Sequence, residues 1–193
     1  MLPLILASAS PRRAELLHGL GLDFTIVTRP TEEAHHEDFT ARELCLFNAY
    51  RKARAVAKLH PQALVLGADT LVYLGTTLYA KPSDMADAHR MLRELAGHTH
   101  QVVTGVCLLH LARHHCQLFA ETTNVTFKPL SDSQISAYLA AIQPLDKAGA
   151  YAIQDRGDEI VQRISGSFSN VVGLPVERVK HELAQWRRAS RLL

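Results

Sequence analysis

The sequence predicts a mixed α/β fold, built as one domain from 193 residues. Short apolar runs with strand character alternate with segments of helical spacing, which favours a sheet covered by helices over a bundle or a sandwich. Two long segments with strand character, 101–111 and 117–127, follow each other closely and are expected to pair antiparallel. The sheet is therefore predicted to be mixed and twisted. No linker rich in proline, glycine or serine divides the chain, so we expect a single domain over residues 1–193.

Strands are predicted where apolar residues follow one another between turn residues. The run of residues 63–68 has no polar interruption, so we expect it at the centre of the sheet. Gly75 separates two short apolar pieces and predicts a hairpin. The predicted strands are residues 2–7, 24–27, 63–68, 71–74 with a partner near 78, 101–111, 117–127 and 160–164.

Helices are predicted from residues that satisfy the first free N–H groups of a helix. Pro61 is expected to stop the second helix near residue 59, and Gly97 to end the third. The predicted helix starts are Ser10 followed by Pro11, Thr40 with Glu43, Ser83, Ser131 with Gln134, and Pro175.

Charge and composition argue against two classes of partner. The formal net charge is +2 and aromatic residues make up 6 % of the chain, so neither nucleic acid nor a membrane surface is expected as a partner. No apolar run approaches ~20 residues, so no membrane span is expected. The apolar start of the chain lacks a basic region before it, so no signal peptide is expected either. A cytoplasmic location is the resulting prediction.

The cysteines and histidines show no spacing typical of a metal site. Cys45, Cys107 and Cys116 lack a C-x-x-C pattern and are expected to be reduced thiols rather than a disulfide framework. The 11 histidines form neither H-E-x-x-H nor a zinc spacing, and most are expected at the surface.

The turn from Ser8 to Arg13 is the first candidate site. It follows a predicted strand and opens a predicted helix, which lets backbone N–H groups, hydroxyls and the guanidinium groups of Arg12 and Arg13 converge. Such a turn binds phosphate through the helix N-terminus and bidentate arginine contacts. The residues alone equally allow a capped helix with two solvated arginines.

Carboxylates and lysines supply further candidates. Asp69 ends a buried apolar run, and at the carboxyl end of a strand it would face a ligand crevice. A carboxylate there ligates a hard cation or accepts a proton from water, although a turn aspartate bonded to its own backbone fits as well. Taken singly, Glu33, Lys52 and Lys81 are also compatible with solvated charges. The amide of Gln154 suits a base edge or a turn hydrogen bond.

Together and in this order, these segments resemble the motifs of the Maf family. The motifs span nearly the whole chain without a large gap, and an ordered set of this kind is highly specific. The resemblance favours a functional role for the phosphate, metal and base positions over a capped helix, a turn aspartate and solvated charges. The motifs are LILASASPRR at 4–13, LGADT at 66–70, AKP at 80–82, GHTHQVVTG at 97–105, DKAGAYAIQ at 146–154 and NVVGLP at 170–175.

The resemblance implies a fold related to the inosine-triphosphate pyrophosphatases, with a mixed sheet and two lobes beside a central cleft. It implies a hydrolase that cleaves nucleoside triphosphates between the α and β phosphates. One branch of the family acts on dTTP and UTP, and its characteristic arginine, threonine and glutamine are matched here by Arg12, Thr70 and Gln154. The branch that acts on 7-methyl-GTP carries tryptophan and glutamine at the first two positions, which this sequence lacks.

The resemblance also implies roles for single residues. Asp69 is the implied general base, and Asp69 with Glu33 would hold Mg²⁺ or Mn²⁺, which bridges phosphates and lowers the pKa of a bound water. Cationic side chains would surround the triphosphate, while Thr70 and Gln154 would read the pyrimidine edge. The implied substrate-binding residues are Ser8, Arg12, Arg13, Lys52, Thr70, Lys81 and Gln154.

The family's link to septum formation leaves a second class open, a nucleotide-binding regulator of cell division. The retained phosphate and metal groups favour the enzyme, with a role in housekeeping of nucleotide pools that extends to modified pyrimidine nucleotides. A homodimer is implied as well. Some relatives carry an acid where this chain has Ser167, and no role is assigned to that loop.

Overall fold

The computed structural model describes residues 2–32 and 39–189. The chain divides into two compact units. The first comprises residues 1–69, 104–121 and 173–193, and the second comprises residues 70–103 and 122–172, each as far as it is described. Both units are therefore assembled from segments that lie far apart in the sequence.

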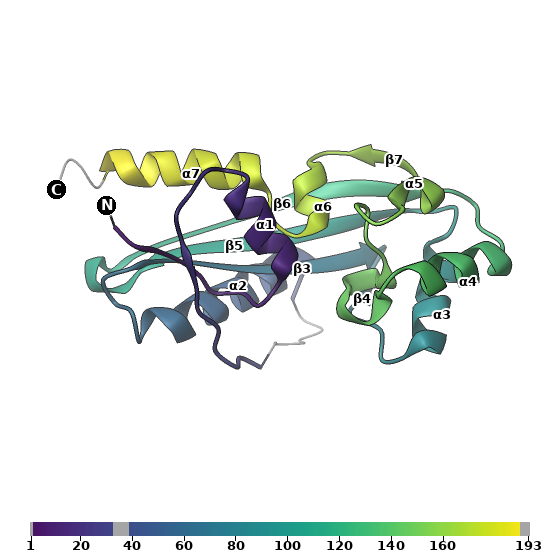
Figure 1. Cartoon of the computed structure of the whole chain (residues 1–193), viewed down its shortest axis with the longest axis horizontal. Coiled ribbons are helices and arrows are strands. Elements are labelled where there is room, and N and C mark those ends of the chain that lie inside the picture. The colour runs from purple at the N-terminus through teal and green to yellow at the C-terminus, as the bar shows by residue number, and fades with distance from the viewer. Residues whose placement is uncertain (1, 33–38, 190–193) are drawn as a thin grey trace. The chain divides into compact units, whose positions relative to one another are not determined.

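One mixed sheet contains all strands of the described residues. They are β1 (Leu4–Leu6), β2 (Thr25–Ile26), β3 (Leu64–Leu74), β4 (Thr77–Tyr79), β5 (Thr99–His110), β6 (His115–Phe127) and β7 (Val161–Ser165). Their order is β2-β1-β3-β5-β6-β7, and β4 pairs with β3. The long strands β3, β5 and β6 run beside one another in Figure 1. The pairs of β1 with β2 and with β3 are parallel, whereas β3–β4 and β6–β7 are antiparallel.

The two long strands β5 and β6 are antiparallel, as the sequence predicted. The N–H of Phe127, at the end of β6, donates to His98 O just before β5, and Gly97 N donates to Lys128 O, both at 3.0 Å. A mixed α/β fold is thereby confirmed.

The helices are α1 (Pro11–His18), α2 (Ala41–Ala57), α3 (Met85–Leu95), α4 (Asp132–Ala141), α5 (Gly157–Ile160), α6 (Phe168–Val172) and α7 (Val176–Ala189). Short 3₁₀ turns lie at Leu111–Arg113, Pro144–Asp146 and Ala148–Ala150. No described helix is long and apolar enough to cross a bilayer.

Local capping signals located most helix starts correctly. The capping boxes of Thr40 with Glu43 and of Ser131 with Gln134 are both formed. The prediction of Ser83 as the cap of α3 is wrong by one residue. The cap is Asp84, whose carboxylate accepts from Asp87 N at 2.8 Å, while Asp87 accepts from Ser83 N at 3.0 Å.

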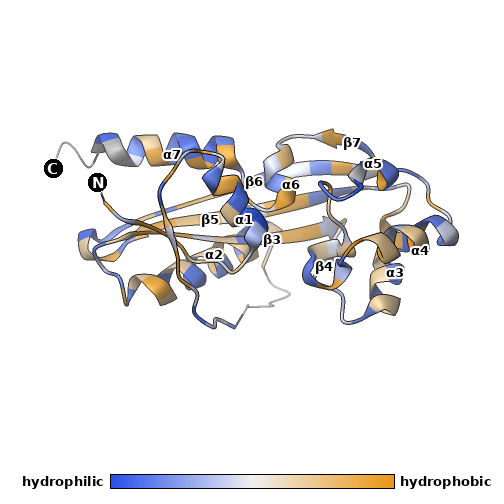
Figure 2. Cartoon of the chain, viewed as in Figure 1, coloured by the Kyte–Doolittle hydropathy of each residue, from blue (hydrophilic) through white to orange (hydrophobic). Residues whose placement is uncertain are grey.

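In the first unit, helices cover both faces of the strands. Side chains alternate along the strands: Leu4 and Leu6 pack with α1 and α7, while Ile5 packs with α2. Figure 2 shows α7 with an apolar and a polar face. Its residues Leu183 and Trp186 are buried on that apolar face.

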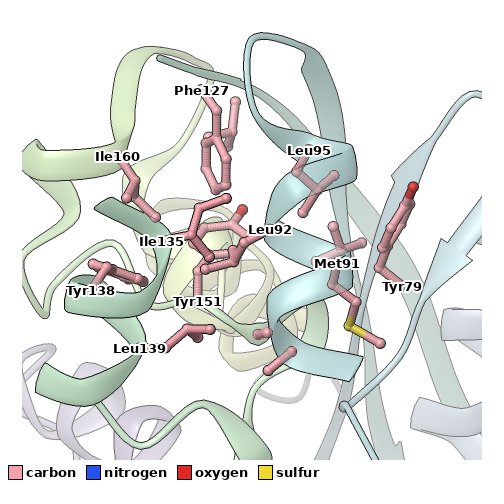
Figure 3. Packing of buried hydrophobic residues seen from close by; sticks show 14 of the residues in the cluster. Tyr79, Met91, Leu92, Leu95, Phe127, Ile135, Tyr138, Leu139, Tyr151 and Ile160 are labelled. Carbon is pink, nitrogen blue, oxygen red and sulfur yellow. The ribbon is translucent and has the colours of Figure 1, made fainter. Parts of the chain in front are cut away.

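The second unit has its own core beside the strands. Helices α3 and α4 face each other there, with Leu92 and Leu95 packed near Ile135 (Figure 3). Phe127 of β6 and Tyr151 fill the space between, with ring centroids 4.9 Å apart at an interplanar angle of 81°. This edge-to-face packing is a favourable arrangement for two aromatic rings.

Candidate active site

Asp69 lies inside β3, not at its end as the sequence predicted. The strand continues through Thr70 to Leu74 because the apolar and β-branched residues after Asp69 suit a pleated strand. The parallel pairing of β3 with β1 does end just before it, at Leu66 opposite Leu6. Asp69 therefore still lies just past the carboxyl end of the parallel part of the sheet.

The carboxylate of Asp69 is held by two side chains of α2. Lys52 Nζ lies 2.6 Å from Oδ1, and Asn48 Nδ2 donates to Oδ2 at 3.2 Å. Asp69 is 4 % exposed and Asn48 is 2 % exposed. Asn48 and Lys52 stand one helical turn apart, so the same face of α2 binds both carboxylate oxygens. A buried carboxylate needs such donors, because an unpaired one would be costly.

Two motif glycines allow α2 to lie this close to the sheet. A Cβ on Gly67 of β3 would lie 2.4 Å from Ala49 O, and one on Gly105 of β5 would lie 2.5 Å from the carbonyl carbon of Cys45. Both distances are shorter than any real Cβ contact. A side chain at either position would therefore push α2 away, and with it Lys52 and Asn48.

The turn before α1 is shaped by Ser8 and Arg13. Ser8 Oγ accepts from Ser10 N at 3.2 Å and from Arg13 Nη1 at 3.2 Å. Arg13 Nε also donates to Gly173 O at 2.9 Å. Ser10 occupies the N-cap position of α1, as predicted, but its side chain makes no capping hydrogen bond within the described residues. The turn is thus fixed by Ser8 and Arg13 rather than by Ser10.

The Ser8 turn and Asp69 lie at the same end of two neighbouring strands. Ala7 N donates to Leu66 O at 2.7 Å, which continues the parallel ladder between β1 and β3 up to the turn. Ser8 follows by one residue on one strand and Asp69 by three on the other. The first unit therefore brings together the predicted residues of the turn, which include Arg12, and the Lys52–Asp69 pair.

The remaining predicted site residues that the structure describes belong to the second unit. Thr70 is half-buried, while Lys81 and Gln154 are exposed. Ala80 O accepts from Gly149 N at 3.1 Å, so the motif that carries Lys81 and the motif that carries Gln154 are neighbours. Glu33, the second predicted metal ligand, lies outside the described residues.

The segment that leads to Gln154 is fixed by buried side chains. Tyr138 of α4 donates its hydroxyl to Ala152 O at 3.0 Å and accepts from Ala152 N at 3.1 Å. His100 Nε2 lies 2.8 Å from the hydroxyl of Tyr151. Gln154 thus stands at the end of a segment that two core side chains hold in place.

Sequence reasoning missed Asn48 and His100. An asparagine within a helix has no pattern of its own, and its one signal is the four-residue spacing to Lys52. His100 is 1 % exposed, an exception to the expectation of surface histidines, and so is His110. Most other described histidines do lie at the surface. Burial lowers the pKa of His100 to about 4, so the ring is neutral at pH 7.

Ser167 takes part in a local network of the second unit. Its N–H donates to Thr123 Oγ1 and its carbonyl accepts from the same hydroxyl, both at 3.1 Å. Ser167 Oγ lies 2.9 Å from Ser169 Oγ and accepts from Asn170 N at 3.2 Å. Hydroxyl and backbone groups thus close the loop around Ser167.

The described residues contain one carboxylate with the placement expected of a metal ligand. No group of three or more histidine, cysteine or acidic side chains that suits a metal ion occurs among them. Asp69 nevertheless fits Mg²⁺ or Mn²⁺ chemistry, because Mg²⁺ is commonly bound through one or two carboxylates together with waters and substrate phosphates.

A family model and several known proteins are similar to this chain over most of its length. A family model described as "Maf-like protein" matches residues 3–186. A dTTP/UTP pyrophosphatase of Akkermansia muciniphila is 44 % identical over 177 residues, covering 92 % of this chain and 93 % of that protein. One of Phocaeicola vulgatus is 45 % identical over 183 residues, covering 93 % and 94 %.

Among solved structures, a dITP/XTP pyrophosphatase of Mycobacterium abscessus matches with a TM-score of 0.48 and 16 % identity, covering 100 % of this chain and 99 % of that one. The family match spans both compact units and all six motifs. From the family match and the two relatives at 44 % and 45 % identity, the chain belongs to the Maf family.

Proposed function

We propose that this protein is a nucleoside triphosphate pyrophosphatase that hydrolyses dTTP and UTP to the monophosphate and pyrophosphate. The observation that carries the proposal is the buried Asp69 carboxylate held by Lys52 and Asn48 beside the Ser8–Arg13 turn. The names of the relatives support the same activity, since proteins 44 % and 45 % identical over most of the chain are dTTP/UTP pyrophosphatases.

In this proposal the α1 turn binds phosphate. The N-terminal end of a helix favours an anion, and Arg12 stands in the first turn of α1 with its guanidinium charge. Arg13 is bound to Ser8 and to the Gly173 carbonyl, so its main part is to shape the turn while adding positive charge. Neutralising the phosphate oxygens matters because charge stabilisation supplies most of the catalysis in phosphoryl transfer.

Asp69 is the proposed general base and Lys52 its partner. A carboxylate oxygen accepts the proton of the water that attacks the phosphorus, and the bond to the leaving pyrophosphate breaks. Lys52 donates to Asp69, and its positive charge attracts the phosphate oxygens next to the carboxylate. Asn48 keeps the second carboxylate oxygen oriented.

A divalent cation fits this arrangement. Mg²⁺ or Mn²⁺ would be held by Asp69, with Glu33 as the further ligand that the family resemblance implies. When bound, the cation supplies positive charge to the phosphate oxygens.

Base recognition is assigned to Thr70 and Gln154. A glutamine amide offers a donor and an acceptor together, which matches the N3–H and carbonyl groups on the edge of uracil or thymine. Loss of such paired groups discriminates strongly between substrates, because the unmatched polar groups then stay unpaired.

A panel of nucleoside triphosphates tests the proposal. The protein is incubated with each triphosphate in Mg²⁺, in Mn²⁺ and in a chelator, and monophosphate and pyrophosphate are quantified separately. We expect both products in equal amounts from dTTP and UTP, lost with the chelator and with Asp69→Asn. Release of orthophosphate and a diphosphate would contradict cleavage between the α and β phosphates. Absence of any product would leave a nucleotide-binding regulator as the function.

A further inference from the structure

Two of the cysteines lie side by side in the first unit. Cys107 of β5 and Cys116 of β6 have their Sγ atoms 3.9 Å apart, and both are free thiols. Neither residue belongs to the proposed catalytic site. The proposed catalytic mechanism therefore assigns no role to the pair.

The two thiols are brought together by neighbouring strands of the sheet. β5 and β6 are antiparallel neighbours joined by the short turn Leu111–Arg113. To form a disulfide, the two sulfurs approach each other from 3.9 Å to the ~2.05 Å of a bond.

The two thiols differ in the way an attacking and a resolving cysteine do. Cys116 is exposed, and its hydrogen bond with Cys107 lowers its pKa to about 7, so much of it is thiolate at neutral pH. Cys107 is buried, and its hydrogen bond to Cys116 together with its burial raises its pKa. Cys116 is thus the group that an oxidant meets first.

Cys45 provides an internal contrast. It is fully buried, it donates to Arg42 O at 3.3 Å, and burial raises its pKa to about 12. A thiol in such surroundings is inert toward oxidants. Any oxidation chemistry of the described residues is therefore expected at the β5–β6 pair.

We propose that Cys107 and Cys116 form a modification site, at which hydrogen peroxide converts the two thiols into an intramolecular disulfide. The juxtaposition of one exposed and one buried thiol on neighbouring strands carries this inference.

The reaction has two steps that balance. The thiolate sulfur of Cys116 attacks one oxygen of hydrogen peroxide, the O–O bond breaks, and Cys116 sulfenic acid forms with hydroxide, which takes up a proton to give water. The sulfur of Cys107 then attacks the sulfenic sulfur, the S–O bond breaks, and the Cys107 proton leaves with the hydroxyl as a second water. Two thiols are oxidised and one peroxide is reduced to two molecules of water.

The experiment treats the full-length reduced protein with hydrogen peroxide and counts free thiols after unfolding. We expect the three thiols of the sequence to fall to one, with a peptide that links residues 107 and 116 by mass spectrometry. Dithiothreitol should restore all three. Cys45→Ala is the matched control, and it should lose both of its remaining thiols in the same way.

The single variants separate the two steps. Cys107→Ala should stop at the sulfenic acid, which dimedone labels on Cys116, whereas Cys116→Ser should protect Cys107 from oxidation. Circular dichroism checks that each variant is folded. A disulfide between two copies of the chain through Cys116, oxidation of Cys45 before the pair, or persistent Cys116 sulfenic acid in the unmodified chain would overturn the proposal.

Discussion

At the scale of single residues, Asp69 is the proposed general base, and replacing one of its carboxylate oxygens by an NH2 group tests that role. Asp69→Asn preserves the size of the side chain but removes the proposed base and the proposed anionic metal ligand. We expect kcat for dTTP to fall by at least ~10². Initial rates of pyrophosphate release measure the effect, with thermal unfolding as the control for the fold. Near-normal turnover would remove Asp69 from the role of base.

Asn48 is a positioning residue, and its loss should differ from the loss of Lys52. Asn48→Ala removes one of the two donors to Asp69, worth about 1–2 kcal/mol, so kcat should fall roughly tenfold while KM stays nearly constant. Lys52→Met also removes a positive charge from the proposed phosphate site, so KM should rise too. Steady-state kinetics on both variants decide the matter. A rise of KM in Asn48→Ala would show that Asn48 contacts substrate instead.

Gln154 offers a test of specificity rather than of rate. Gln154→Ala should reduce kcat/KM for dTTP and UTP by about 10–100-fold, since a base edge loses its paired amide, and change other triphosphates less. Competition between UTP and a purine triphosphate gives the ratio directly. An equal loss for all substrates would mean that Gln154 serves binding in general and does not read the base.

At the scale of elements, the contact of α2 with β3 determines where Lys52 and Asn48 lie relative to Asp69. In Gly67→Ala the new Cβ would lie 2.4 Å from Ala49 O, a clash with backbone that only a shift of α2 relieves. We expect a loss of about 1–3 kcal/mol in the free energy of unfolding, together with a fall in kcat, because Lys52 and Asn48 move with the helix.

Gly75→Ala is the matched control for that variant. Gly75 lies in the β3–β4 turn at φ +61°, with no atom within 4 Å of a new Cβ. Only backbone strain of about 1 kcal/mol is expected there, with kcat unchanged. Urea unfolding and kinetics on both variants provide the comparison. If the two glycine variants lost kcat equally, the close approach of α2 would not explain the site.

At the scale of the whole molecule, stability should depend on pH through His100. Its pKa is about 4 in the folded protein and about 6.5 in the unfolded chain, so the unfolded chain binds more protons between these values. The free energy of unfolding therefore has its full value above pH 6.5. It falls by about 3 kcal/mol in all as the pH falls toward 4.

Unfolding in urea between pH 4 and 7 measures this loss in the free energy of unfolding. His100→Gln keeps a polar partner for Tyr151 but does not titrate, so the difference between the two proteins isolates the histidine. We expect the variant to lose less stability on acidification. Parallel curves for the two proteins would contradict a neutral, buried His100.

The sequence predicted local features well and distant contacts poorly, for a physical reason. The caps at Thr40 and Ser131 depend on neighbours three residues away, so the pattern contains the whole interaction. The length of β3 was underestimated because a charged residue interrupts its apolar run, and the buried donors that tolerate Asp69 come from another element. Asn48 and His100 acquire their roles only through tertiary contacts.

The hydrogen bond from Arg13 to Gly173 spans 160 positions of the sequence. A nascent chain that ends at Asn170 contains the first five motifs but lacks the Gly173 carbonyl. The hydrogen bond that holds Arg13 in the Ser8–Arg13 turn therefore cannot form yet. Incomplete chains should lack the properly shaped Ser8 turn and remain inactive toward nucleotides until synthesis passes this glycine. Shaping of the Ser8–Arg13 turn thus requires synthesis of the chain to pass Gly173.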